Sequence, residues 1–268
     1  PFKCKFCVIA KLPYQERSTK NVVDEIEQCY YDFGIREIDI FDGTFFINKN
    51  RTLEICQEIR RRGIRIEWTC RSRADVLNEE VLKEASRAGC REINLGIESA
   101  VPEILEGINK QIKIEQVKNA VKLCNKYGIR VLGFFMFGNP GETEETLKKT
   151  IKFMLTLNLD FVQICRTIAK PKTDLDDFLI KETGRDYWHE FVLGKVGEER
   201  LPTPWTKLNQ REIEKYLKLA YYSFFFRPQY IWRRIVQLKS FAEFWRYIRV
   251  ALRMLWHYFY WDVPHPKV

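Results

Sequence analysis

The chain has 268 residues, of which 46% are hydrophobic and 30% are charged, a composition typical of a globular protein with one sizeable core. No apolar run approaches the roughly 20 residues that cross a membrane, since the longest candidate, 250–261, is interrupted by Arg253 and His257. Without a secretory signal, the eight cysteines are interpreted as thiols or metal ligands rather than disulfides. The sequence therefore predicts a cytoplasmic protein.

The net charge of +9 is unevenly placed. Residues 209–268 hold 11 Lys and Arg against 4 Asp and Glu, together with 17 of the 38 aromatic residues. A basic, aromatic segment suits contact with acidic lipids, nucleic acid or a large apolar anionic substrate. It is more often typical of helices that pack their aromatic rings on the main domain and leave their arginines in solvent.

Helix and strand patterns alternate along residues 20–165. Helices are expected at 20–33, 48–62, 77–88, 114–127 and 144–157, and strands at 35–41, 64–70, 92–97, 129–137 and 161–165. Repeated helix–strand crossovers build parallel sheets. Since a loop with Cys4 and Cys7 precedes the first helix, a sixth strand is expected upstream of Pro1. The predicted fold is α/β, a partial (β/α)6 barrel that lacks its first strand.

The character of the chain changes to helices after about residue 171. We therefore predict two domains, a core barrel at 1–172 and a helical, basic and aromatic extension at 173–268. Capping-box pairs are expected at Asn209/Glu212 and Ser240/Glu243. A helix after 240 has an apolar stripe beside a row of arginines, a pattern that suits a membrane surface or docking on its own domain.

Residues that could bind a cofactor or take part in a reaction follow the predicted strands. In parallel barrels, chemistry takes place on loops at the carboxyl ends of the strands. By this interpretation one shared site holds Cys4, Cys7, Asp42, Arg71, Glu98, Gly138 and Arg166.

The spacing Cys4-Lys-Phe-Cys7 permits several kinds of site. Closely spaced thiolates bind iron-sulfur clusters, but a lone Cys-x-x-Cys also serves as a zinc half-site or a redox pair. A zinc site would need a second Cys or His pair, and the three histidines are far apart in the sequence. Other cysteines are expected to be packing residues, namely Cys29, Cys56, Cys90 and Cys124.

Several motifs occur in a fixed order along nearly the whole chain. They are CKFC (4–7), RS (17–18), DIFDGTFFINKNR (39–51), INLGIES (93–99), GFFMFGNPGET (133–143) and FFFRPQYIWRR (224–234). Together they resemble the radical S-adenosylmethionine (SAM) superfamily, in particular the subgroup with a cobalamin-binding domain. That subgroup includes the anaerobic magnesium-protoporphyrin IX monomethyl ester cyclases and the hopanoid methylases. The resemblance implies a further cysteine directly before Pro1, and hence an N-terminally truncated fragment.

The resemblance implies a role for each matching residue. Cys4 and Cys7, with the upstream cysteine, would hold a 4Fe-4S cluster whose fourth iron binds SAM. The residues implied to contact SAM are Phe6, Asp42, Gly43, Thr44, Arg71, Glu98, Ser99, Gly138 and Pro140. Among these, Phe6 would lie against the adenine, and Glu98 and Ser99 would reach the ribose or methionine end. One electron would then cleave SAM to a 5′-deoxyadenosyl radical. No catalytic residue is singled out.

The implied function is that of a radical SAM enzyme of methyltransferase or cyclase type, assisted by cobalamin from a preceding domain. A large apolar substrate is expected, such as a tetrapyrrole or an isoprenoid lipid, with flavodoxin or ferredoxin as electron donor. The C-terminal helices would contact a membrane peripherally, and nucleic acid is not expected. Two alternatives are an RNA-modifying radical SAM enzyme and a non-catalytic, basic membrane-surface protein with a decayed cluster site.

Each assigned residue also has a purely structural interpretation. Asp42-Gly43 suits a plain turn, residues 138–141 suit a tight link into a helix, and Glu98 suits a solvated loop acid. Two departures from the family pattern are Gly43, where relatives often carry an acid, and Lys172, where they often carry glycine. Because lysine disfavours positive φ, the loop at Lys172 is expected to differ in shape.

Overall fold

The computed structural model describes residues 2–197, 202–236 and 240–260. By its contacts the chain divides into two compact units, Pro1–Ile213 and Glu214–Val268. No helix within the described ranges is long and apolar enough to span a bilayer.

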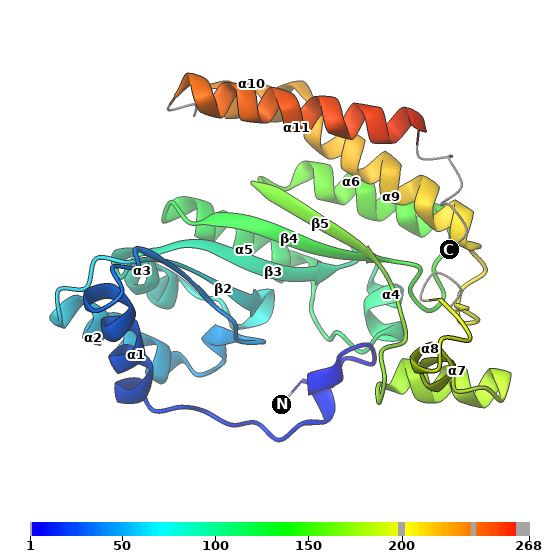
Figure 1. The fold of residues 1–268 in the computed structure, drawn as a ribbon, viewed down its shortest axis with the longest axis horizontal. Coiled ribbons are helices and arrows are strands. Elements are labelled where there is room, and N and C mark those ends of the chain that lie inside the picture. The colour runs from blue at the N-terminus through cyan, green and yellow to red at the C-terminus, as the bar shows by residue number, and fades with distance from the viewer. Residues whose placement is uncertain (1, 198–201, 237–239, 261–268) are drawn as a thin grey trace. The chain divides into compact units, whose positions relative to one another are not determined.

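The first unit is built on one five-stranded parallel sheet, in the order β1-β2-β3-β4-β5 (Figure 1). The strands are β1 (Glu37–Ile40), β2 (Glu67–Arg73), β3 (Cys90–Glu98), β4 (Arg130–Phe137) and β5 (Phe161–Arg166). Helix α1 (Thr19–Tyr31) precedes β1, and the helices between the strands are α2 (Lys49–Arg61), α3 (Glu79–Arg87), α4 (Pro102–Gly107), α5 (Ile114–Lys126) and α6 (Glu144–Thr156). The predicted α/β partial barrel is therefore confirmed. Strand β1 lies at one edge of the sheet and has no strand partner on its outer side among the described residues.

The start of β3 depends on a glycine. Gly89 has a φ of 99°, and a Cβ atom there would lie 2.0 Å from the carbonyl oxygen of Ile66. The Gly89 carbonyl accepts a hydrogen bond from Trp68 N at 3.0 Å. Only glycine allows this close backbone approach, and it sets the register with which β3 enters the sheet beside β2.

The two faces of the sheet differ in burial. Along β4, Val131, Phe135 and Phe137 are fully buried, whereas the alternating Phe134 and Met136 are only partly buried. Parallel sheets are usually covered on both faces. A half-open inner face at the barrel interior therefore leaves space for a cofactor or a substrate.

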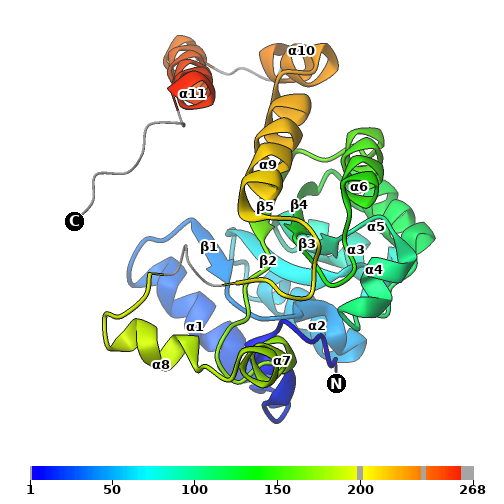
Figure 2. The same cartoon turned by 90° about the vertical axis from the view of Figure 1, so that its right-hand side faces the viewer.

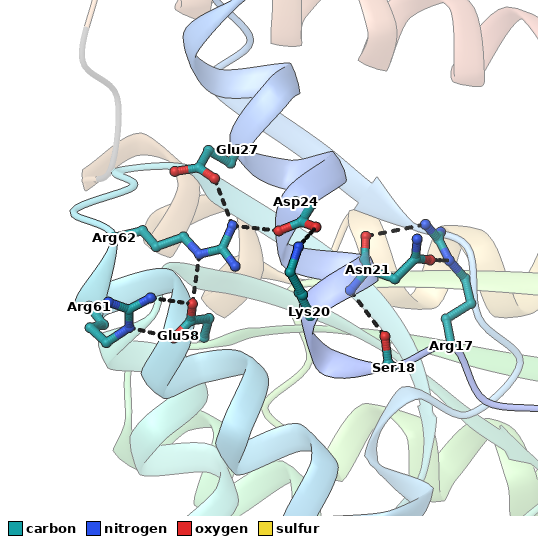
Figure 3. A network of polar contacts seen from close by, with 9 residues as sticks. All are labelled: Arg17, Ser18, Lys20, Asn21, Asp24, Glu27, Glu58, Arg61 and Arg62. Carbon is teal, nitrogen blue, oxygen red and sulfur yellow. Dashed lines mark hydrogen bonds and ion pairs between the residues drawn. The ribbon is translucent and has the colours of Figure 1, made fainter.

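Helices α1 and α2 are joined by a network of polar contacts around Arg62 (Figure 3). The Arg62 guanidinium lies between Asp24 and Glu27 of α1, at 2.8 and 2.6 Å, and Glu58 of α2, at 2.7 Å. The Arg62 side chain is 13% exposed. The network fixes the two helices next to the edge strand.

The segment after β5 packs within the first unit. Helix α7 (Asp174–Thr183) contributes Leu175 and Leu179 to a small apolar core with Ala169, and Phe6 and Trp205 pack against that core. Helix α8 (Tyr187–Val192) follows. The boundary predicted between residues 172 and 173 marks a change in composition, while the division by contacts falls after Ile213.

The second unit is helical. It comprises most of α9 (Gln210–Phe225), α10 (Pro228–Val236) and α11 (Phe241–Tyr260). The predicted capping box begins α9, since Asn209 Oδ1 accepts from Glu212 N at 2.9 Å and Glu212 Oε2 accepts from Asn209 N at 2.7 Å. The side chain of Glu243, in the second predicted box, lies outside the described part of the chain.

Candidate cluster and cofactor site

The loop with Cys4 and Cys7 is held by three backbone hydrogen bonds. Cys7 N donates to Cys4 O at 3.1 Å and closes a turn that brings the two cysteines together. Lys5 N donates to Ile108 O at 3.0 Å, and Leu175 N donates to Lys5 O at 3.2 Å. The loop therefore lies between the end of α4 and the start of α7, as Figure 2 shows for the N-terminal segment and α7. Both thiols are free, with Cys4 buried and Cys7 partly exposed.

The structure brings eight of the predicted residues to one cavity of about 450 Å³. They are Cys4, Phe6, Cys7, Asp42, Gly43, Thr44, Arg71 and Glu98. The cavity lies where the carboxyl ends of β1, β2 and β3 meet the cysteine loop. This position is the one in which parallel barrels place their chemistry.

Four predicted residues lie outside the lining of that cavity, namely Ser99, Gly138, Pro140 and Arg166. Ser99 is fully buried, and its Oγ lies 3.2 Å from Thr150 Oγ1 of α6 and accepts from Val101 N at 3.2 Å. Gly138 and Pro140 belong to the turn after β4, where the Gly138 carbonyl accepts from Trp205 Nε1 at 2.8 Å. In this structure the Ser99 hydroxyl joins β3 to α6, and Trp205 covers the turn.

Glu98 is not a solvated acid. It is 6% exposed, has a φ of 66°, and pairs through Oε1 with Lys110 Nζ at 2.9 Å. Positive φ is uncommon for a residue other than glycine, and such strain gathers at functional sites. A buried carboxylate needs a partner of this kind, and Lys110 provides it.

Two cations of the cavity, Arg73 and Lys110, were missed by sequence reasoning. Lys110 lies in the link between α4 and α5, and no pattern in the sequence indicates it. Arg73 had a signal, because the period of two along a strand places it on the same face as Arg71. The strand was predicted to end at Cys70, whereas β2 continues to Arg73.

The side chains of Phe6 and Arg71 already have protein partners. Phe6 lines the cavity and also packs on the core of Ala169, Leu175 and Leu179. Arg71 makes two hydrogen bonds of 2.9 Å to Asp39, and its guanidinium lies 4.0 Å from the centre of the Phe41 ring. The Arg71 guanidinium lowers the pKa of the Asp39 carboxyl below its ordinary value.

The loop at Lys172 was expected to differ in shape because lysine disfavours positive φ, but the backbone of Lys172 has a positive φ. Lys172 has a φ of 65°, and its amide donates to Asp176 Oδ2 at 3.0 Å. Lysine therefore takes the left-handed conformation that glycine adopts readily. The hydrogen bond that the Lys172 amide donates to Asp176 compensates in part for the steric cost of this conformation.

Burial raises the pKa of the Cys4 thiol, while the charges of Lys110 and Arg73 act to lower it. A thiol must lose its proton to bind iron. The two cations offset the effect of burial only in part, so the metal-free thiol holds its proton more firmly than a free cysteine, while the same cations would stabilise a metal-bound thiolate.

The donor set fits part of an iron-sulfur site. Two free thiols on one loop share a cavity with two buried cations. No group of three or more His, Cys, Asp and Glu side chains in the described ranges is arranged to bind a metal ion. A 4Fe-4S cluster held by three thiolates would thus take Cys4 and Cys7 from these residues and one further ligand from elsewhere.

Comparison with known proteins defines the class of this fold and site. Residues 1–154 match the sequence model of the Radical SAM superfamily. The chain therefore belongs to the radical SAM superfamily, a class of enzymes, as its motifs predicted.

The relatives include the cyclase that the motifs resemble. The chain is 35% identical to an uncharacterized methyltransferase of Pyrococcus horikoshii over 97% of its own length and 56% of the relative's. It is 33% identical to the anaerobic magnesium-protoporphyrin IX monomethyl ester cyclase of Rubrivivax gelatinosus, over 65% of the chain and 32% of that protein. The chain thus spans about half, or less, of these relatives.

A solved structure shares the fold. The radical SAM methyltransferase TsrM from Kitasatospora setae, with cobalamin and a [4Fe-4S] cluster bound, matches with a TM-score of 0.61 and 24% identity. The match covers 67% of this chain and 38% of TsrM. This likeness supports the partial barrel.

Proposed function

We propose that the chain is the radical SAM core and C-terminal extension of a cobalamin-assisted methyltransferase or cyclase. The observation that carries the proposal is the meeting of Cys4 and Cys7 with six other predicted residues around one cavity at the carboxyl ends of the strands. The names of the relatives support the reaction class.

Each part of the cavity has a proposed task. Cys4 and Cys7 hold two irons of a 4Fe-4S cluster, and the turn at 42–44 and Glu98 bind the methionine and ribose parts of SAM. With an electron from flavodoxin or ferredoxin, the bound cluster and SAM supply a 5′-deoxyadenosyl radical. The turn at 42–44 is preformed, because Asp42 Oδ1 accepts from Thr44 N at 3.2 Å. Gly43 allows the Ile9 side chain, which also lines the cavity, to approach this turn closely, since a Cβ there would lie 2.4 Å from Ile9 Cδ1.

A large apolar substrate suits the inner face of the sheet. Phe134 borders the cavity, and Met136 lies two residues further along the same face of β4. Apolar side chains around a small number of polar groups are typical of ligand sites. We propose a tetrapyrrole or an isoprenoid lipid as substrate, with cobalamin held by a separate domain.

The test uses the protein with its upstream residues restored, reconstituted anaerobically with iron and sulfide. Incubation with SAM and a strong reductant is expected to yield 5′-deoxyadenosine. We expect Cys4→Ala and Cys7→Ala to lose the iron-sulfur absorption and at least about 100-fold of the product, because each removes a ligand. Cys29→Ala, on α1, is the matched control and should retain both.

Two results would count against the proposal. A wild-type protein that binds no iron-sulfur cluster would remove its basis. A loaded cluster that persists in Cys4→Ala would show that the ligands lie elsewhere in the protein.

We also propose a peripheral contact between the C-terminal helices and anionic lipid. Trp232 of α10 and Trp245 and Trp256 of α11 are exposed. The same helices contain arginines, and a basic amphipathic helix with exposed tryptophan is typical of a membrane surface.

A further inference from the structure

Arg73 places a cation directly beside one of the two thiols. It is the last residue of β2 and is only 5% exposed. Its Nη1 lies 3.6 Å from Cys4 Sγ, a distance at which a guanidinium donates to sulfur. Such a buried charge is costly unless its hydrogen bonds are satisfied.

The other donors of the guanidinium fix its orientation. Nε and Nη2 each donate to one oxygen of the Asp75 carboxylate at 2.9 Å. Nη2 also donates to the Lys110 carbonyl at 2.7 Å, and the Phe2 ring lies 3.9 Å from Cζ. This rigid fork leaves Nη1 directed at the sulfur, a geometry that a lysine ammonium could not reproduce with the same partners.

The hydrogen bonds from Arg73 to the Asp75 carboxylate and the Lys110 carbonyl would by themselves account for an arginine with a purely structural role. They join the end of β2 to the link between α4 and α5, and they need nothing from Nη1. The contact between Nη1 and Cys4 is the part of the arrangement that a purely structural role leaves unexplained. Lys110 is the other cation nearby, and its charge is directed to Glu98 at 2.9 Å.

We propose that Arg73 is a positioning residue that donates a hydrogen bond to the Cys4 thiolate of the bound iron-sulfur cluster and raises its reduction potential. The proposal rests on the proposed function, since it requires the cluster. Reduction adds negative charge to the cluster, and a hydrogen bond to a ligating sulfur stabilises that charge. Partners of ligand atoms tune metal sites in this way.

The test is a potentiometric titration of the reconstituted cluster, followed by electron paramagnetic resonance, for wild type, Arg73→Met and Arg73→Lys. We expect Arg73→Met to load the cluster but to show a more negative midpoint. A tenfold fall in the ratio of reduced to oxidised cluster at fixed potential corresponds to 59 mV for one electron. Arg73→Lys should lie between the two, since it keeps the charge and loses the fork.

Arg62→Met is the matched control, because it removes a largely buried arginine that is ion-paired with α1 and α2 (Figure 3) and does not line the cavity of Cys4. Its midpoint should equal that of wild type. A loaded Arg73→Met protein with the wild-type midpoint would overturn the proposal and leave the proposed function intact. If Arg73→Met does not fold, a wild-type midpoint in Arg73→Lys overturns it instead. A wild type that loads no cluster refutes the proposed function itself.

Discussion

The carboxyl group of Glu142 lies beneath the turn that follows β4, with 1% of the residue exposed. Its Oε2 accepts hydrogen bonds from Gly138 N and Asn139 N, while its Oε1 has no hydrogen-bond partner among the described residues. Burial raises the pKa of Glu142 to about 7, and the two amide bonds only partly offset this effect. A protonated carboxylic acid therefore holds the turn at acidic pH.

This raised pKa predicts a pH-dependent stability. Between the ordinary glutamate value of 4.5 and about 7, the unfolded chain has lost the proton while the folded protein retains it. The free energy of unfolding then falls as pH rises through this window, by on the order of 3 kcal/mol at most. Denaturant unfolding from pH 4 to pH 8 measures it. Glu142→Gln should flatten the profile, because its amide does not titrate.

The control for this measurement is Glu106→Gln, which changes an exposed carboxylate on α4. Its profile should keep the wild-type slope. An unchanged slope in Glu142→Gln would instead assign the pH dependence to other groups.

The site residues differ in how far the sequence could reveal them. Cys4 and Cys7 are recognised by spacing on one loop, and Asp42 and Glu98 by their places after strands. Lys110 lies in the site only because the chain turns back after α4, and no local sequence pattern predicts this change of direction. Ser99 belongs to a family motif, yet its hydroxyl contacts α6, because motif matching does not give the direction of a side chain.

At the scale of elements, α6 follows the glycine-rich turn directly and depends on its cap. Thr143 Oγ1 accepts from Thr146 N at 3.3 Å, and Thr146 Oγ1 accepts from Thr143 N at 2.9 Å. These bonds satisfy amide groups that the first turn of a helix leaves unpaired.

We expect Thr143→Ala to lower the free energy of unfolding by ~1 kcal/mol, the usual cost of a lost N-cap. Thr143→Ser keeps the hydroxyl and should retain most of the stability. Equal losses in the two variants, measured by chemical denaturation, would show that the methyl group rather than the cap is responsible.

The bounds of strands were predicted well where buried and exposed residues alternate, and poorly where polar residues of the site break this alternation. Strand β4 was expected at 129–137 and is Arg130–Phe137, because its buried residues alternate regularly. Strand β2 was expected at 64–70 but is Glu67–Arg73. Its last three residues are polar because they border the cavity, so the apolar pattern ends before the strand does. Helix α4, with six residues, is too short to show a period.

At the scale of the whole molecule, the uneven charge has a measurable consequence. The second unit contains exposed arginines at 246, 249 and 253, on the same helix as exposed tryptophans. We expect the protein to sediment with vesicles of anionic phospholipid at low salt and to be released by high salt, because salt screens surface charges. Replacing Arg246, Arg249 and Arg253 by Gln should reduce the bound fraction several-fold.

A triple variant of the first unit, Lys118→Gln, Lys122→Gln and Lys152→Gln, has the same change in net charge and serves as control. It should bind as wild type does. Equal losses in both triple variants would mean that net charge alone, rather than the C-terminal helices, drives the binding.

The outer side of β1 has a consequence for handling the protein. Unpaired amide and carbonyl groups along an edge strand are a template for any extended chain that reaches them. Exposed apolar residues flank this edge, including Phe41 at 85% exposure. We therefore expect β1 to be the site at which a second copy of the chain adds to the sheet, leading to aggregation or strand exchange at high concentration. A strand donated by the same polypeptide would occupy the edge first and keep the protein monomeric.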